Sequence, residues 1–327
     1  MTLLQTLLHV TNFRNPFLRT LVPSIATAFA IQGAVAVPSI LTESERFYDF
    51  SGAITYLSVT ALSVYLPTLR ARAAASLAGT LKPGFPSLLA AFTGTGGPHG
   101  LNWRQVVLST AVSIWAARLG SYLFQRALAD GDSRFDEIKK SPSRFLGTFV
   151  AQAAWVSICL LPVLALNSIP HTLLSTLPLI TLTDIAGLSL FISGFALEVA
   201  ADRQKNAWVA AKKRKEHDED FLTSGLWSKS RHPNYFGEST LWTGIAVTAA
   251  GVLASGVGLR GMGLSGMGGV GRVVGLGLCA ASPAFVTFLL LKVSGVPLSE
   301  DKYDKRYGHR KDYQEWKKNT PMFVPKF

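Results

Sequence analysis

Hydrophobic residues are gathered into long runs along this chain, and the charged residues lie mainly between those runs. An α-helix needs about 20 apolar residues to cross the hydrocarbon core of a membrane. Seven runs reach that length, at residues 18–41, 50–69, 106–128, 145–166, 179–201, 236–257 and 270–291. The pattern therefore predicts an all-α fold, a polytopic transmembrane helical bundle of about seven spans.

The segments between the runs differ in character. Residues 168–181 are apolar but short and contain Pro170 and Pro178, which predicts a connection at the membrane interface. Residues 73–100 are rich in glycine and proline, which predicts an irregular loop. The tail from residue 299 onward is too aromatic for a disordered segment, so we expect it to fold over the ends of the spans. We divide the chain into residues 1–103, with the first spans and the loop, and residues 104–327, a membrane domain with a ligand pocket.

The charge supports the membrane interpretation and predicts an orientation. Only 16% of the residues are charged, and Lys and Arg outnumber Asp and Glu by 32 to 20. No segment resembles a soluble basic domain, so we expect no nucleic-acid partner. With seven spans, about 22 basic residues fall on the side of the C-terminal tail and 8 on the other side. Cytoplasmic loops are enriched in Lys and Arg, which predicts a cytoplasmic C-terminus.

The N-terminal region has no acidic residue before Glu43, a bias that mitochondrial presequences share. The run at residues 18–41 is nevertheless long enough to span a membrane, so we expect a retained first helix. A mitochondrial membrane stays open as an alternative location.

Motifs for metal and Rossmann-type dinucleotide sites find no support. The six histidines are scattered, and Cys159 and Cys279 lie inside apolar runs, so no metal site is expected. The pattern G-x-G-x-x-G occurs at residues 261–266 and 266–271, but no strand precedes it and no acid follows about twenty residues on. We interpret it as a flexible turn that leads into a closely packed helix carrying Gly271 and Gly275.

Two pairs of polar residues within or at the end of apolar runs are spaced by one helical turn. Arg118 and Tyr122 are four residues apart in the third run, on one face of the expected helix. Guanidinium groups suit phosphate, although an arginine here could also extend its head to the interface. Glu198 and Asp202, also four apart, end the fifth run. They are either ordinary helix-end polarity or acids that orient a polar ligand.

The densest polar and aromatic cluster is Gly-Leu-Trp-Ser-Lys-Ser-Arg-His-Pro-Asn-Tyr-Phe-Gly-Glu at residues 225–238. Pro233 favours the first position of a helix, so the sixth span is expected to begin at about Asn234 or Tyr235. The free N–H groups of that first turn would face an anion or a polar amide. Arg231 and His232 lie just before them, and Glu238 follows Asn234 by one turn. The cluster predicts a ligand site at this end of the span.

These residues resemble a known family. The segment 231–238 is similar to the C-terminal domain of steroid 5-alpha-reductases and to sterol C14/delta7 reductases. Three further blocks resemble the same family: Arg118 with Tyr122, residues 201–205, and the tail from Tyr303 to Pro325. The chain looks most like an uncharacterised branch of predicted membrane reductases. Isoprenylcysteine carboxyl methyltransferases carry a similar Arg-His-Pro-x-Tyr segment.

The resemblance implies an NADPH-dependent membrane reductase whose cofactor pocket opens to the cytoplasm, with the endoplasmic reticulum as the default location. By this match, Asn234 would hold the nicotinamide amide, with Tyr235 and Glu238 near it. Arg118 and Tyr122 would contact the phosphate or ribose portions. The other implied pocket residues are Asp202, Arg231, His232 and Tyr303.

One position departs from the family pattern. Steroid reductases carry a proton-donating tyrosine three residues before the arginine that matches Arg118, and this chain has Trp115 there. An indole cannot donate a proton to an enolate, and enone reduction needs an acid for the developing oxyanion. Tyr122 and Glu198 are the candidate catalytic residues in its place.

The residues leave three function classes open. The first is an integral-membrane oxidoreductase that uses NADPH to reduce a double bond of a sterol or enone lipid. The second is a membrane methyltransferase that uses S-adenosylmethionine, although Asn234 and the Phe-Gly-Glu continuation favour the reductase. The third is a non-catalytic membrane protein whose polar cluster binds lipid headgroups.

Overall fold

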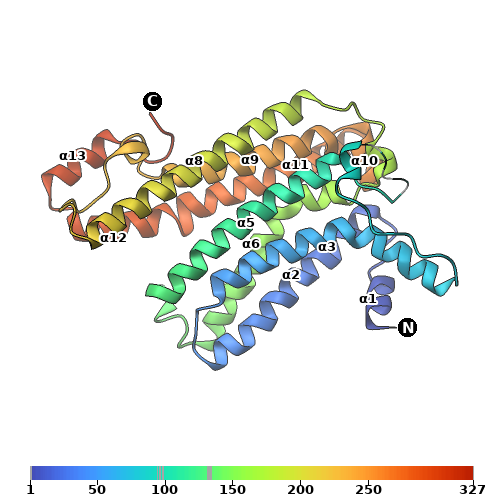
Figure 1. The fold of residues 1–327 in the computed structure, drawn as a ribbon, viewed down its shortest axis with the longest axis horizontal. Coiled ribbons are helices and arrows are strands. Elements are labelled where there is room, and N and C mark those ends of the chain that lie inside the picture. The colour runs from blue at the N-terminus through green and yellow to red at the C-terminus, as the bar shows by residue number, and fades with distance from the viewer. Residues whose placement is uncertain (1, 94, 96, 98, 131–134, 327) are drawn as a thin grey trace. The chain divides into compact units, whose positions relative to one another are not determined.

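The protein is built from α-helices (Figure 1). The computed structural model describes every residue except 1, 94, 96, 98, 131–134 and 327, and this described part contains no strand. Six of its helices are long and apolar enough to cross a membrane, and a bent helix pair raises the number to seven if it counts as one span. The predicted polytopic helical bundle is confirmed.

The chain divides into two compact units. Unit 1 comprises Met1–Thr181 and Ala249–Cys279, and unit 2 comprises Leu182–Thr248 and Ala280–Phe327. Two helices, α9 (Pro233–Leu253) and α11 (Gly268–Phe288), therefore contribute residues to both units.

Unit 1 is built around four long helices: α2 (Pro16–Leu41), α3 (Tyr48–Leu77), α5 (Trp103–Asp130) and α6 (Pro142–Asn167). Short helices α1 (Leu3–Val10), α4 (Ala90–Thr93), α7 (His171–Leu174) and α10 (Gly256–Met262) lie at their ends. Buried polar side chains join the long helices. Gln32 of α2 donates to Thr55 Oγ1 of α3 at 2.8 Å, and Asn167 donates to Ser63 of α3 at 2.9 Å. Such hydrogen bonds join membrane helices where lipid is as apolar as the side chains.

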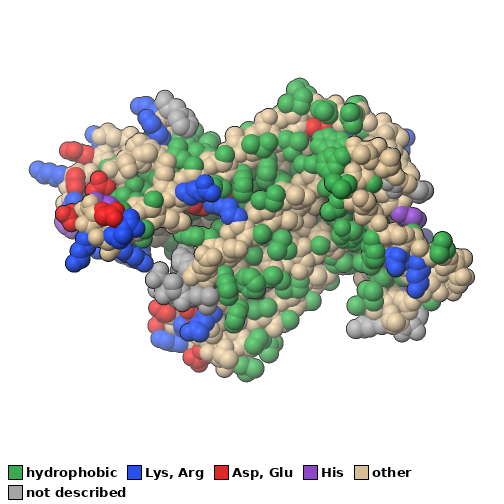
Figure 2. Space-filling view, in the orientation of Figure 1, with side chains coloured by type: hydrophobic (Ala, Val, Ile, Leu, Met, Phe, Trp, Pro, Cys, Tyr) green, Lys and Arg blue, Asp and Glu red, His purple; other side chains and the backbone are tan. Residues whose placement is uncertain are grey.

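Unit 2 contains α8 (Leu182–Lys213), α9 up to Thr248, and the end of α11, which continues as a π-helix over Leu289–Val293. Its tail forms α12 (Val296–Tyr307) and α13 (Lys311–Asn319), where charged side chains are crowded (Figure 2). The expectation of a folded C-terminal tail is confirmed.

Glycines bring α8 and α9 into close backbone contact. Gly187 and Gly194 are seven residues apart on α8, as are Gly237 and Gly244 on α9. A Cβ atom on Gly244 would lie 2.5 Å from the Gly187 carbonyl oxygen, and one on Gly194 would lie 2.5 Å from the Leu241 nitrogen. We call these four glycines the glycine seam. They allow two helix backbones to approach more closely than any larger residue would permit.

The predicted sixth span is correct in place but wrong at its C-terminal end. Helix α9 ends at Leu253 rather than Val257, and α10 follows at an angle of 89°. The break arises because the Ser255 hydroxyl accepts a hydrogen bond from the Gly258 N–H at 3.1 Å and so caps a new helix. The hydropathy pattern predicts no helix break here, because the residues around Ser255, namely Ala254, Gly256 and Val257, are all apolar or small.

Other helices extend beyond the predicted apolar runs. Helix α8 continues to Lys213, three turns past Ala201, and α3 continues to Leu77. The predicted irregular loop at residues 73–100 is therefore shorter than expected, and it includes α4. A hydropathy pattern identifies only the apolar part of a helix. The backbone hydrogen bonds of the helix can continue through polar residues beyond that part. In α11, a Cβ atom on Gly275 would lie 2.9 Å from the Leu253 carbonyl oxygen at the end of α9, the close packing expected there, whereas one on Gly271 would lie 2.6 Å from the Leu264 carbonyl oxygen of the preceding turn.

Candidate functional site

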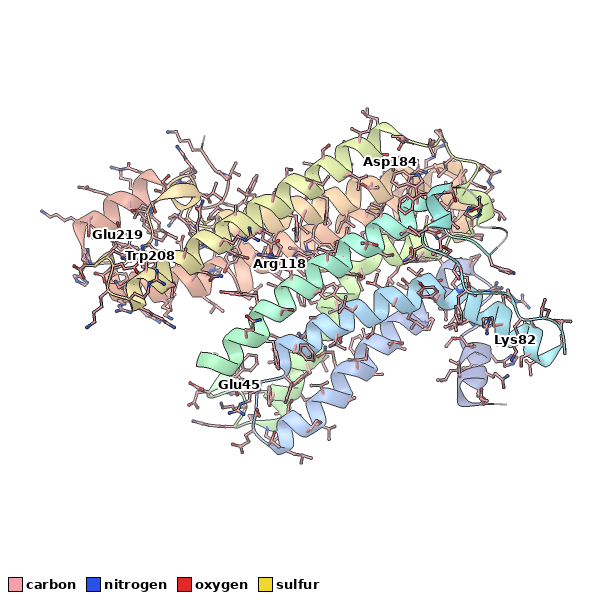
Figure 3. All side chains as sticks on the ribbon, viewed as in Figure 1. Glu45, Lys82, Arg118, Asp184, Trp208 and Glu219 are labelled. Atoms are coloured by element: carbon pink, nitrogen blue, oxygen red, sulfur yellow. The ribbon has the colours of Figure 1, made fainter. Side chains whose placement is uncertain are left out.

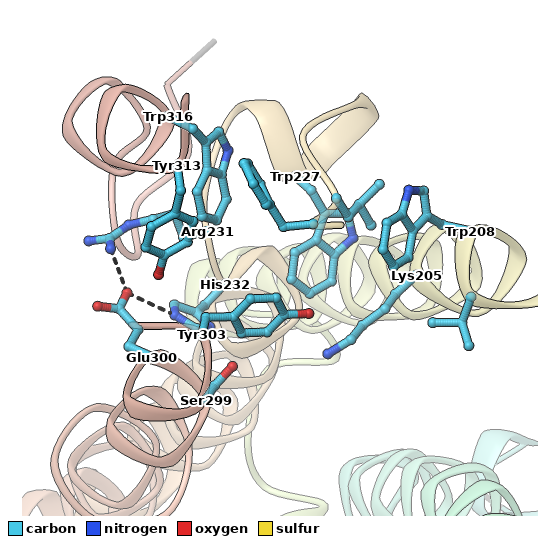
Figure 4. A pocket seen from close by; sticks show the side chains of 13 residues that line it. Lys205, Trp208, Trp227, Arg231, His232, Ser299, Glu300, Tyr303, Tyr313 and Trp316 are labelled. Carbon is cyan, nitrogen blue, oxygen red and sulfur yellow. Dashed lines mark hydrogen bonds and ion pairs between the residues drawn. The ribbon is translucent and has the colours of Figure 1, made fainter. Parts of the chain in front are cut away.

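A pocket in unit 2 collects side chains from α8, the segment before α9, and the tail helices (Figure 4). Aromatic rings form much of its wall, and four charged or titratable groups interrupt them. The aromatic members are Trp208, Phe221, Trp227, Tyr303, Tyr313 and Trp316, and the polar groups are Lys205, Arg231, His232 and Glu300. We call this the tail pocket.

The segment before α9 is attached to α8 by a tight turn. Gly225 has φ +61°, and a Cβ atom there would lie 2.7 Å from the Gln204 side chain. The same Gln204 Oε1 accepts a hydrogen bond from the Leu226 N–H at 2.9 Å. Trp227 then donates its indole N–H to the Ala201 carbonyl at 3.1 Å. This attachment places the Trp227 ring 5.2 Å from Lys205 Nζ, at one side of the tail pocket.

The end of the chain holds Arg231 and His232 in place. The Arg231 N–H donates to the Pro321 carbonyl at 2.9 Å, and Ser230 Oγ donates to the Phe323 carbonyl at 2.8 Å. The His232 N–H in turn donates to Ser230 Oγ at 3.1 Å. The last residues of the chain therefore position the segment that begins the predicted ligand site.

Glu300 of α12 is the centre of the charged groups. Its carboxylate lies 2.7 Å from Arg231 Nη1, 3.3 Å from His232 Nε2 and 3.2 Å from Lys317 Nζ. Burial lowers the pKa of His232 to about 4, although the nearby Glu300 opposes the shift. The imidazole is therefore neutral at pH 7, and the positive charge beside Glu300 comes from Arg231 and Lys317.

Arg231 keeps unused hydrogen-bond donors despite its ion pair. Within the described residues, its buried Nε and Nη1 atoms make no directed hydrogen bond. Nη1 is close enough to Glu300 for an ion pair, but the approach does not satisfy hydrogen-bond geometry. Arg231 Nε is therefore a buried donor that no described residue satisfies, while Nη1 is held by the ion pair.

Asn234, the second residue of α9, has the complementary feature, a buried acceptor without a donor among the described residues. Its Nδ2 donates to Asp202 Oδ1 of α8 at 3.2 Å. Its Oδ1 is buried, and the described part of the chain offers it no donor. Tyr235, the next residue, stacks its ring on His232 with centroids 5.3 Å apart and planes 3° from parallel.

Unit 2 thus brings several predicted site residues together. Asp202 contacts Asn234, while Arg231, His232 and Tyr303 line the tail pocket and Tyr235 stacks on one of its walls. Glu198 is buried at 3% exposure beside the glycine seam, where a Cβ atom on Gly237 would lie 2.7 Å from its nitrogen. Glu238 is half-buried on α9.

Arg118 and Tyr122 belong to unit 1. Arg118 lies partway along α5 (Figure 3) and is half-buried. Tyr122 is exposed. Trp115 is 1% exposed, and its ring packs edge-on against Tyr56 with centroids 5.2 Å apart. Its indole therefore serves in the core of unit 1. That Arg118 and Tyr122 join the residues of unit 2 in one site stays a prediction.

Sequence reasoning missed the residues that the tail contributes. Glu300 and Lys317 form the ion pairs beside Arg231, and Trp316 closes part of the pocket wall. The mixture of charged and aromatic residues after 299 indicated that the tail folds, but it gave no partner for any one of them. Trp227, only four residues before Arg231, belonged to the recognised cluster and could have been included.

The fold and the pocket define a polytopic helical membrane protein with a polar and aromatic site in its C-terminal part. A family model described as a protein of unknown function (DUF1295) matches residues 69–261 and 269–320, which is most of the chain. The chain belongs to this DUF1295 family, which is associated in general with steroid 5-alpha-reductase-like membrane proteins. No curated protein and no solved structure matches the chain.

Proposed function

We propose that the protein is an integral-membrane oxidoreductase that uses NADPH to reduce a double bond of a lipophilic substrate, such as a sterol or an enone lipid. Family membership supports a reductase-like membrane protein in general. The segment Arg231–Glu238, with its similarity to the reductase motif, supports the cofactor.

One observation carries the proposal: two buried polar groups of opposite kind lack hydrogen-bond partners within a four-residue stretch. In the described residues, Asn234 Oδ1 lacks a donor and Arg231 Nε lacks an acceptor, while Arg231 Nη1 is held only by the ion pair with Glu300 at 2.7 Å. An unsatisfied buried polar group costs about 1–3 kcal/mol. A dinucleotide offers both complements, because its carboxamide donates hydrogen bonds and its phosphates accept them. The residues present therefore fit the cofactor.

The tail pocket fits a portion of such a ligand. Trp208, Trp227 and Tyr303 offer ring faces on which a planar heterocycle can stack. The enclosed volume is about 50 Å³, small beside the roughly 300–1,000 Å³ of whole-ligand pockets. Only one part of a dinucleotide would be enclosed here.

The chemistry divides between the cofactor and the protein. NADPH, when bound, supplies the hydride. The chain must orient the cofactor, exclude water and provide a proton for the oxyanion that develops on the substrate. We propose Glu198 or Tyr122 for the proton, because the indole of Trp115 cannot donate it. Glu198→Gln would then abolish reduction while leaving NADPH affinity unchanged.

A cofactor titration of the purified full-length chain tests the proposal. Thermal stabilisation is measured with NADPH, NADH and S-adenosylmethionine for the wild type, Asn234→Ala and the control Asn319→Ala. We expect NADPH to stabilise the wild type most. Asn234→Ala should weaken NADPH binding about tenfold, as loss of one or two hydrogen bonds implies. Asn319 is exposed at the end of α13, so its substitution should change nothing.

Two results would contradict the reductase proposal. Stabilisation by S-adenosylmethionine alone would favour the methyltransferase class. Binding of no cofactor, with equal behaviour of Asn234→Ala and Asn319→Ala, would favour a non-catalytic protein.

A further inference from the structure

Unit 1 contains a cavity that the proposed reductase activity does not use. Its volume is about 560 Å³, within the range of roughly 300–1,000 Å³ typical of small-molecule sites. It lies where α2 and α5 begin and where α3 and α6 end. All of its lining residues belong to unit 1. We call it the N-terminal cavity.

Two arginines line this cavity without a carboxylate to balance them. Arg70 of α3 donates from Nη2 to the Thr11 carbonyl at 2.9 Å and to the Arg19 carbonyl at 3.0 Å, and from Nη1 to the Leu8 carbonyl. Arg19 of α2 donates to the Phe13 carbonyl. Every acceptor is neutral, and no acidic residue is among those lining the cavity. The described residues form no ion pair with either guanidinium, so the cavity presents net positive charge.

A buried amide in the same cavity has an unused acceptor. Asn167 is 2% exposed and donates from Nδ2 to Ser63 Oγ at 2.9 Å and to Ser109 Oγ at 3.1 Å. Its Oδ1 accepts no hydrogen bond from the described residues. Its neighbour Gln105 differs, because that side chain donates to the Leu166 and Ile169 carbonyls and accepts from the Asn102 N–H. The Asn167 oxygen is thus a buried acceptor, in a residue that lines the cavity, that no described residue satisfies.

The rest of the lining is largely apolar. Val64, Leu66, Pro67, Leu101 and Ile169 contribute hydrocarbon surface next to the two arginines. A ligand that matches this lining has an anionic group for the arginines, a donor for Asn167 and an apolar portion. Free phosphate matches only the first of these features.

We propose that the N-terminal cavity binds an acidic phospholipid that carries a hydroxyl in its headgroup. The phosphate lies against Arg19 and Arg70, since guanidinium groups bind phosphate through charge-assisted hydrogen bonds. The headgroup hydroxyl donates to Asn167 Oδ1. The start of an acyl chain contacts the apolar wall. This lipid is neither the cofactor nor the reduced substrate, and its site does not depend on the reductase activity.

Lipid titration followed by native mass spectrometry tests the proposal on the full-length chain in detergent. The probes are phosphatidylglycerol, phosphatidylcholine and inorganic phosphate. Phosphatidylglycerol should bind at least tenfold more tightly than phosphatidylcholine. Arg19→Gln should weaken phosphatidylglycerol binding about tenfold, because charge-assisted hydrogen bonds are lost. Arg14→Gln is the matched control, since Arg14 is exposed, near in sequence and absent from the lining.

A second variant tests the cavity itself rather than its charge. Ala71→Phe places a ring in the space that Ala71 lines, without removing a charge. It should weaken phosphatidylglycerol binding while leaving NADPH binding in the tail pocket unchanged. Equal losses in Arg14→Gln and Arg19→Gln would indicate nonspecific surface attraction and overturn the proposal. Unchanged lipid affinity in Ala71→Phe, or inorganic phosphate binding as tightly as the lipid, would also overturn it.

Discussion

Arg231 and His232 are neighbours in sequence but differ in charge beside Glu300. Arg231 and His232 both contact the same carboxylate, at 2.7 and 3.3 Å. Only the guanidinium is charged at pH 7, because burial lowers the pKa of His232 to about 4. His232 therefore acts as a neutral ring on which Tyr235 stacks. Arg231, together with Lys317, supplies the positive charge beside Glu300.

This arrangement predicts a loss of stability in acid. The pKa of His232 falls from an ordinary 6.5 to about 4 on folding. Between these values the unfolded chain binds more protons, so the folded state loses stability as pH falls from 6.5 and the loss is complete below 4. It should amount to about 3 kcal/mol. Thermal denaturation from pH 7.5 to 4 measures it.

Two histidine variants isolate this contribution. His232→Asn should flatten the acid limb of the stability profile. His309→Asn, at an exposed position, should keep the wild-type profile. A profile in His232→Asn as steep as that of the wild type would contradict the assignment.

At the scale of elements, the glycine seam decides how closely α8 and α9 pack. Glu198 and Asp202 lie on α8, and Asn234 lies on α9. The hydrogen bond of 3.2 Å between Asn234 and Asp202 requires the two backbones to stay close. The seam is therefore the structural basis of this part of the site, although none of its glycines bears a functional group.

Gly244→Ala should separate the two helices. The new methyl group would press against the Phe191 nitrogen and lie 2.5 Å from the Gly187 carbonyl oxygen, and both are backbone atoms. We expect a loss of about 1–3 kcal/mol in the free energy of unfolding, as overpacking implies. NADPH affinity should fall with it.

Gly33→Ala is the control for helix propensity. Gly33 lies within α2, and a Cβ atom added there would meet no other atom within 4 Å. Alanine there should be neutral or stabilise by up to about 1 kcal/mol. Thermal melts of both variants in the same detergent give the comparison, and an equal effect of the two substitutions would exclude a role for the seam.

At the scale of the whole molecule, the residues after α13 return to the segment just before α9 at the candidate site. Residues 321–326 return to the segment at 229–231, where the Lys326 N–H donates to the Lys229 carbonyl at 2.9 Å and the Arg231 N–H donates to the Pro321 carbonyl. The helices α12 and α13 between them supply Glu300 and Lys317. The tail is therefore part of the candidate site rather than an appendage.

Truncation after Thr320 should impair cofactor binding more than folding. It removes the carbonyl acceptors of Arg231 and Ser230, so Arg231 loses its fixed position. We expect NADPH affinity to fall about tenfold, with the apolar spans intact. Truncation after Pro325 keeps both acceptors and should bind NADPH nearly as the wild type does. Equal affinities for the two truncated chains, measured by titration, would show that the tail does not position Arg231.

The sequence by itself determined the class of the fold and the location of the main polar cluster. Apolar runs long enough to cross the lipid predict helices directly. In a membrane, the backbone must satisfy its own hydrogen bonds, and few structures other than a helix do so. The Arg231–Glu238 segment is equally visible, since so many polar groups at a helix start are unusual. The helix ends were less predictable: Ser255 caps a new helix within an apolar stretch, and α8 continues past its apolar run to Lys213.

Only the tertiary structure decided which residues are partners. Glu300 lies 69 positions from Arg231 in sequence, and no local pattern links them, yet the fold of the tail brings them to 2.7 Å. The same holds for Asn167, which lines a cavity with Arg19 and Arg70 from two other helices and whose Oδ1 no described residue satisfies. Hydropathy reports the environment of each residue averaged over its neighbours in sequence, whereas a binding site depends on pairwise distances between residues that are distant along the chain.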